Sequence, residues 1–132
     1  MKKILMTLCM LPFLIWVQGC ATATYEIEGY TASSMNPGIP VPSNAKLIKI
    51  ITDSGNRNIK EGMMYELKHI GGEQGLYPPL DYFQKLADTG WVELEEERMG
   101  HVHFLKKDNT VIAIEIQENT FKIYEMIKGA LE

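Results

Sequence analysis

A chain of 132 residues is long enough for one domain and too short for two of ordinary size. Its 17 acidic residues outnumber its 13 basic ones, which gives a formal net charge of −4. A surface of that sign repels nucleic acid and anionic lipid headgroups, so the composition argues against a DNA or RNA partner.

The chain begins like a secretory signal. Lys2 and Lys3 precede an apolar stretch over residues 4–17, which is shorter than the roughly 20 residues that span a bilayer. The stretch ends at Val17-Gln18-Gly19-Cys20, and this tetrapeptide resembles the lipobox of bacterial lipoproteins. The resemblance implies cleavage before Cys20 and a diacylglyceryl lipid on its thiol. Residues 1–19 are therefore expected to be a lipoprotein signal peptide, and Cys20 the lipidation site.

The cysteine count agrees with lipidation. Cys9 would leave with the signal, so Cys20 would be the only cysteine of the exported chain. A single cysteine there calls for an explanation, such as an intermolecular disulfide, a reactive thiol or a modification. An ordinary signal peptide that ends near a cysteine is the alternative. Ala21 follows Cys20, whereas aspartate at that position commonly marks inner-membrane retention in such lipoproteins, so the resemblance favours the outer membrane in a cell that has one.

Residues 20–44 are predicted to form the lipidated N-terminus and a flexible tether. The segment is rich in Ala, Thr, Ser, Gly and Pro, and its prolines are expected to block regular strand pairing. As a flexible coil it would reach roughly 25–30 Å from the membrane. Tyr25, Ile27 and Tyr30 leave open the alternative of a short strand. The prolines are Pro37, Pro40 and Pro42.

Residues 45–132 are predicted to form a single α+β domain. Apolar and β-branched runs at residues 45–51 and 63–70 predict two strands, and the glycines of residues 71–75 predict a flexible loop. Pro78 and Pro79 indicate the start of a helix that Gly90 ends. The apolar residues at helical spacing are Leu80, Phe83, Leu86 and Ala87.

After the helix, alternating residues predict a meander of antiparallel strands. A three-residue loop over residues 107–109, with Asn109 left-handed, would pair Phe104 with Ile112. A two-residue turn over residues 118–119 would pair Ile116 with Phe121, and Glu115 with Lys122. We therefore expect one helix packed on an antiparallel sheet of five or six strands, in the order strand, strand, helix, meander. This order resembles that of small uncharacterised domains in other envelope lipoproteins, which implies a fold more than an activity.

The predicted register leaves one face of the sheet outside the core, with an apolar end. Such a patch typically marks a site for a protein partner. The alternative is that the first two strands, or the tail from Lys128 to Glu132, cover it. The candidate partner surface is Trp91, Leu105, Val111, Tyr124 and Met126.

His101 and His103 would lie on the same outer face, with Glu93 or Glu95 opposite them across the hairpin. Two imidazoles and a carboxylate could bind Zn²⁺, although the His-x-His pattern alone is weakly specific. A cross-strand His–Glu pair on a solvated face is the preferred interpretation, so no metal or other cofactor is predicted. The glutamates of residues 93–97 are interpreted as a solvated edge, because acid–base chemistry needs a cleft that separates two pKa values.

The sequence contains no recognisable catalytic motif. We therefore expect a membrane-anchored, non-catalytic binding or scaffolding module that meets an envelope protein. The second hypothesis is an accessory lipoprotein that binds a small ligand or metal through the His101 and His103 face. An enzyme is the third.

Overall fold

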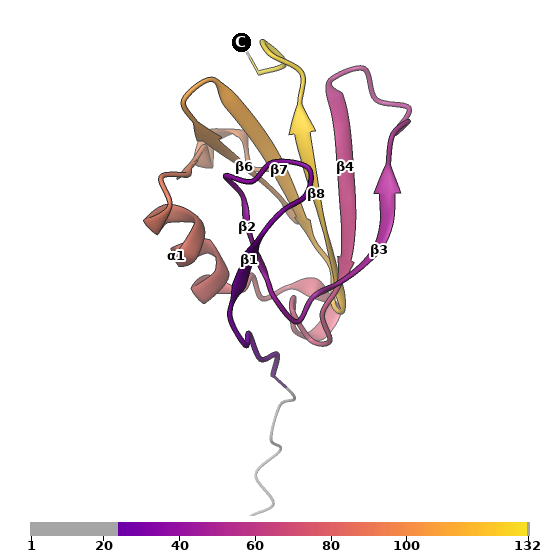
Figure 1. The fold of residues 1–132 in the computed structure, drawn as a ribbon, viewed down its shortest axis with the longest axis vertical. Helices are drawn as coiled ribbons and strands as arrows, with labels where there is room; N and C mark the ends of the chain where they lie inside the picture. Colours follow the sequence, from indigo (N-terminus) through magenta and orange to yellow (C-terminus); the bar gives the residue numbers. More distant parts are fainter. Residues whose placement is uncertain (1–23, 132) are drawn as a thin grey trace, which may run out of the picture.

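A computed structural model describes residues 24–131, and the predicted signal peptide and Cys20 lie outside the described residues. The chain folds into a sheet-rich α+β structure (Figure 1). The strands are β1 Tyr30–Ala32, β2 Pro40–Pro42, β3 Lys46–Ile51, β4 Ile59–Glu66, β5 Val92–Glu93, β6 Val102–Lys107, β7 Thr110–Ile116 and β8 Thr120–Met126. The helices are α1 Leu80–Asp88 and the short 3₁₀ helices η1 Glu73–Gly75 and η2 Glu95–Glu97.

The strands form two antiparallel sheets. Six strands are arranged in the order β3-β4-β8-β7-β6-β5, and β1 pairs only with β2 in a separate two-stranded sheet. We call the face of the large sheet that packs against α1 and the β1–β2 hairpin the inner face, and the opposite face the outer face. The core lies between these layers, with Ile114 and Ile123 at its centre, both 0% exposed. The predicted α+β class, with one α-helix and a mainly antiparallel sheet, is confirmed for the described residues, whereas the second sheet was not predicted.

The helix follows its predicted boundaries. Pro79 is the N-cap of α1, and Gly90 lies just past its C-cap with φ of 100°, a conformation that favours glycine. The buried face differs from the predicted stripe, because Tyr82 and Leu86 are fully buried whereas Leu80 is 77% exposed. The helix therefore turns the Tyr82 side towards the core, where its hydroxyl donates to a carbonyl of the β1–β2 hairpin.

The predicted tether is wrong for the part that the structure describes. The β1–β2 hairpin lies within residues 24–44 and packs on the core, with Ile39 0% and Val41 3% exposed. Tyr82 Oη donates to the Pro40 carbonyl at 2.8 Å, and Trp91 Nε1 donates to the Gly38 carbonyl at 2.9 Å. The folded domain therefore begins well before residue 45.

The prolines of β2 do not block its pairing, because they alternate with the residues that hydrogen-bond to β1. The backbone of Ile39 accepts from Ser33 at 2.9 Å, and that of Ser43 donates to Gly29 at 2.8 Å. Residues 39, 41 and 43 share one parity, so the nitrogens of the prolines at 40 and 42 point away from β1. Proline is tolerated at such positions of an edge strand, where no N–H is needed.

The register of the last hairpin agrees with its prediction, and that of the hairpin before it does not. Ile116 pairs with Phe121 across β7 and β8, as the two-residue turn predicts. Phe104 pairs with Ala113 in place of Ile112, because the β6–β7 turn has two residues rather than three. The positive φ falls on Asp108, at 52°, and not on Asn109. A slip of one residue exchanges the faces of a strand, so every side chain of β6 lies on the face opposite to the predicted one.

The stretch before the helix packs closely against the β7–β8 turn. Gly71 N–H donates to the Glu118 carbonyl at 3.1 Å. A Cβ at Gly71 would lie 2.1 Å from the carbonyl oxygen of Gln117, so only glycine permits this approach. Residues 71–75 are thus a packed turn in place of the predicted flexible loop.

Candidate binding face on the sheet

The outer face of the sheet carries a band of apolar side chains across β6, β7 and β8. Val111, Tyr124 and Met126 lie there, as predicted, and all three are half-buried. The shifted register adds Val102 and Phe104, which lie on the face opposite to the predicted one. Phe104 is only 5% exposed, whereas Val102 is half-buried like the other three, so the band is open to solvent in part.

A glycine shapes this face. Gly62 of β4 lies beside Tyr124 of β8, and a Cβ at Gly62 would lie 2.5 Å from Cδ1 of that ring. The missing side chain lets the aromatic ring lie across the neighbouring strand. The band therefore extends sideways from β8 over β4.

Two members of the predicted partner surface are corrected. Trp91 is 3% exposed and Leu105 is 2% exposed, and both belong to the core. Leu105 pairs with Ile112 and so shares the inner face with it. Trp91 is held by its hydrogen bond to the Gly38 carbonyl. Neither side chain is available to a partner.

A groove of about 520 Å³ lies at one end of the outer face. Outer-face side chains of Lys106, Val111 and Met126 line its base. Residues 94–97 around η2 form one side, and the C-terminal residues 127–131 form the other. Ile127 N–H donates to the Asn58 carbonyl at 2.7 Å, which fixes the start of that tail. The tail thus borders the apolar band, whereas the alternative in the sequence analysis was that the tail would cover it.

The rim of the groove is acidic on the η2 side. Glu95, Glu96 and Glu97 are all solvent-exposed. Within residues 24–131 these three glutamates take part in no ion pair, whereas Glu93 contacts Arg98 and His103. Lys106 at the base and Lys128 on the tail side also line the groove, so its acidic surface is confined to the η2 side. Apolar side chains next to exposed carboxylates are suited to an apolar residue flanked by basic groups.

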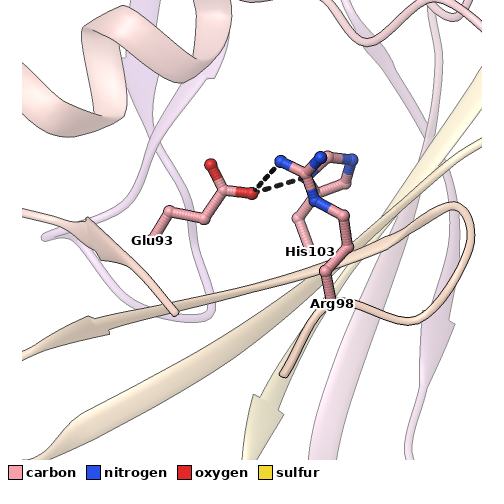
Figure 2. Close-up of polar contacts among 3 residues, drawn as sticks. All are labelled: Glu93, Arg98 and His103. Carbon is pink, nitrogen blue, oxygen red and sulfur yellow. Dashed lines mark hydrogen bonds and ion pairs between the residues drawn. The ribbon is translucent and has the colours of Figure 1, made fainter. Parts of the chain in front are cut away.

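A polar cluster behind this rim holds η2 in place (Figure 2). Arg98, which caps η2, donates from Nη2 to Oε1 of Glu93 at 2.5 Å, and the same oxygen lies 2.8 Å from Nδ1 of His103. Burial alone would raise the pKa of Glu93, but the hydrogen bonds from Arg98 and His103 outweigh burial and lower it. The carboxylate therefore stays charged and connects β5, β6 and the end of η2.

The two histidines do not converge on one site. His103 is 3% exposed on the inner face, where its ring lies 4.6 Å from that of Phe83 on α1. His101 precedes β6, and its Nδ1 lies 3.0 Å from the Gly75 carbonyl. The predicted His–Glu pair exists as Glu93 with His103, but it lies beneath the helix and not on a solvated face. The described residues hold no cluster of three or more side chains suited to a metal.

The sequence predicted only part of this cluster. It placed Glu93 opposite the histidines, and it missed Arg98, whose opposite charge five residues after Glu93 was the available signal. It also missed the groove, because a groove depends on where η2 and the tail turn.

Comparisons with known proteins leave the fold without a family. No protein family, no curated protein and no solved structure matches the chain. Among residues 24–131, no helix has the length and apolar character needed to cross a membrane. A functional proposal therefore depends on the geometry of the outer face and not on analogy.

Proposed function

We propose that this protein is a lipid-anchored envelope lipoprotein whose domain is a non-catalytic binding module for a protein partner. The partner binds the outer face of the sheet. The observation that carries the proposal is the set of half-buried apolar side chains in the band, next to a groove whose η2 side is acidic. These side chains are Val102, Val111, Tyr124 and Met126. Apolar patches bordered by polar residues are typical of protein interaction sites.

The membrane attachment in this proposal comes from the sequence alone. The tetrapeptide at residues 17–20 supports a lipid on Cys20, and Ala21 favours delivery to an outer membrane. Two or more acyl chains give stable anchoring, so the domain would remain at the envelope without a membrane-spanning segment.

The groove supports a specific chemistry for the partner. Val111 and Met126 at its base favour an apolar side chain, and the exposed carboxylates of η2 favour lysine or arginine beside it. Charges at the rim of an interface mainly raise the association rate. We therefore expect a partner segment in which an apolar anchor residue is flanked by basic residues.

Site-specific photo-crosslinking in the native envelope tests this interface. A photoreactive phenylalanine in place of Val111 should give one discrete crosslinked protein, whereas the same residue in place of Gln84, which is exposed on α1, should not. A Glu96→Lys substitution should reduce the Val111 crosslink several-fold without affecting folding, because Glu96 is exposed. Equal crosslinking at positions 111 and 84, or a yield unchanged by Glu96→Lys, would contradict the proposal.

A small ligand is the second candidate occupant of the groove. Its volume of about 520 Å³ falls within the range of roughly 300–1,000 Å³ that is usual for ligand pockets. Such a ligand would use the groove on the outer face and not the buried His103. Native mass spectrometry of the purified protein would detect it as a bound mass that a Val111→Trp substitution displaces.

A further inference from the structure

We propose that an exposed apolar segment at residues 76–80 rests on the bilayer and holds the domain against the membrane surface. This inference relies on the proposed lipid at Cys20, and it adds a second membrane contact to that lipid. We call the segment the membrane patch, formed by Leu76, Tyr77 and Leu80.

The membrane patch concentrates three exposed large apolar side chains within five residues. Leu76 is 59% exposed, Tyr77 is 65% exposed and Leu80 is 77% exposed. Single exposed apolar residues are ordinary on protein surfaces, but a local concentration of them marks an interaction site.

The patch is fixed by backbone hydrogen bonds. Tyr77 N–H donates to the Gly71 carbonyl at 2.8 Å, and Leu76 N–H donates to the Glu73 carbonyl at 3.2 Å. A Cβ at Gly72 would lie 2.8 Å from Cδ2 of Tyr77, so this glycine makes room for the ring. The exposure is therefore a property of a packed turn.

The N-terminal segment leaves the domain beside the patch. The hydroxyl of Tyr25 donates to the carboxylate of Asp81, the residue next to Leu80. In Figure 1 the indigo segment that begins at residue 24 lies at the end of the molecule where α1 begins. From Cys20 to Thr24 there are four residues, which span at most about 14 Å when fully extended. A lipid on Cys20 would thus bring this end of the domain within about 14 Å of the headgroups.

The chemistry of this end favours a neutral membrane surface. Leucine side chains insert into the acyl boundary, and tyrosine favours the interface because it has an apolar ring and a polar hydroxyl. The nearby charged residues are mostly acidic, so zwitterionic lipid should hold the patch better than anionic lipid. These acidic residues are Glu26, Glu28, Glu73 and Asp81.

Depth-dependent tryptophan quenching tests the membrane patch. The chain has two tryptophans, and Trp16 would leave with the signal, so the buried Trp91 is the internal reference. The full-length lipoprotein carrying Tyr77→Trp is reconstituted in phosphatidylcholine vesicles, with and without brominated acyl chains. We expect blue-shifted emission from position 77 that brominated lipid quenches. A Ser54→Trp control, in the exposed loop between β3 and β4, should show neither effect.

Substitution of the two leucines measures how strongly the membrane patch binds lipid. The double substitution Leu76→Asp and Leu80→Asp is made in the Tyr77→Trp background. It should lower the ratio of protein with position 77 in contact with lipid to protein with position 77 in water by at least about tenfold. Met99→Asp is the matched control, because Met99 is 65% exposed elsewhere on the domain and should leave the quenching unchanged.

The outcomes separate this proposal from the proposed function. Intact mass measured on the same preparation reports the lipid on Cys20. An unlipidated chain overturns the membrane patch and the lipid anchor of the proposed function, whereas a lipidated chain without quenching at position 77 overturns the membrane patch alone. A blue shift that depends on protein concentration and not on brominated lipid would assign the patch to a second copy, and would also overturn the proposal.

Discussion

Glu93 connects the buried and exposed parts of the candidate site. Its Oε1 atom accepts a hydrogen bond from Arg98 and lies 2.8 Å from Nδ1 of His103. One of these partners caps η2 and the other lies under α1. Loss of the carboxylate charge should therefore loosen the acidic rim of the groove as well as the contact between helix and sheet.

The lowered pKa of Glu93 makes part of the stability depend on pH. Because its pKa is lower in the folded state than in the unfolded state, the contribution is complete above the ordinary glutamate range. It is lost as the pH falls below about 4.5 and through the lowered value. Glu93→Gln should reduce the free energy of unfolding at pH 7 by about 1–3 kcal/mol and weaken its dependence on pH in that range.

Denaturant unfolding at pH 7 and across the acidic range measures both effects. Glu96→Gln is the matched control, since Glu96 is exposed and should change neither quantity. Identical pH profiles for the wild type and Glu93→Gln would show that this carboxylate does not stabilise the fold.

At the scale of elements, the register of a strand could be predicted only where its two faces differ in apolar character. In β7 and β8 the inward residues are far more apolar than the outward ones, so the alternation identified the register. In β6 both faces carry buried apolar side chains, with Leu105 inward at 2% exposed and Phe104 outward at 5% exposed. The two-residue turn places His103 beside Leu105 on the inner face, whereas a three-residue turn would place Val102 and Phe104 there, so the apolar pattern favoured the wrong turn.

The β1–β2 hairpin was missed for a different reason. Its composition is that of a linker, and its prolines usually indicate irregular structure. Their spacing of two residues, at Pro40 and Pro42, nevertheless places both nitrogens on the unpaired side of β2. The composition of this segment therefore predicted a linker wrongly, whereas the two-residue spacing of its prolines was compatible with a strand.

Substitution in this hairpin separates a folded element from a tether. Ile39→Ala removes a side chain that is 0% exposed, and should reduce the free energy of unfolding by about 2–5 kcal/mol. Ile48→Ala is the matched control, because Ile48 is 42% exposed on β3 and should cost far less. Thermal or denaturant unfolding checks both variants. An equal, small effect of the two substitutions would mean that residues 30–42 contribute little to the core.

At the scale of the whole molecule, the fold class and the helix boundaries followed from the sequence, and so did three of the five residues of the candidate surface. Val111, Tyr124 and Met126 lie on the outer face because the β7–β8 register was right. Leu105 does not lie there, because the register of β6 differs by one residue from the predicted one. Trp91 does not lie there, because its Nε1–H donates to the Gly38 carbonyl in the hairpin that was not predicted. The groove required the positions of η2 and the tail, which no local pattern encodes.

The same hairpin changes the proposed relation between domain and membrane. A long tether would lift the domain away from the headgroups, whereas a domain that begins near Thr24 would be held beside them. The proposed binding face and the proposed membrane patch would then lie on one domain, whose position a short lipidated N-terminus would set.

That N-terminus is the most direct test of the account. Intact and peptide mass spectrometry of the protein from its native envelope should show a mature chain that begins at Cys20 and carries a diacylglyceryl group, with or without a further acyl chain on its amine. A mature chain with an unmodified Cys20, or cleavage at another residue, would contradict the lipoprotein assignment.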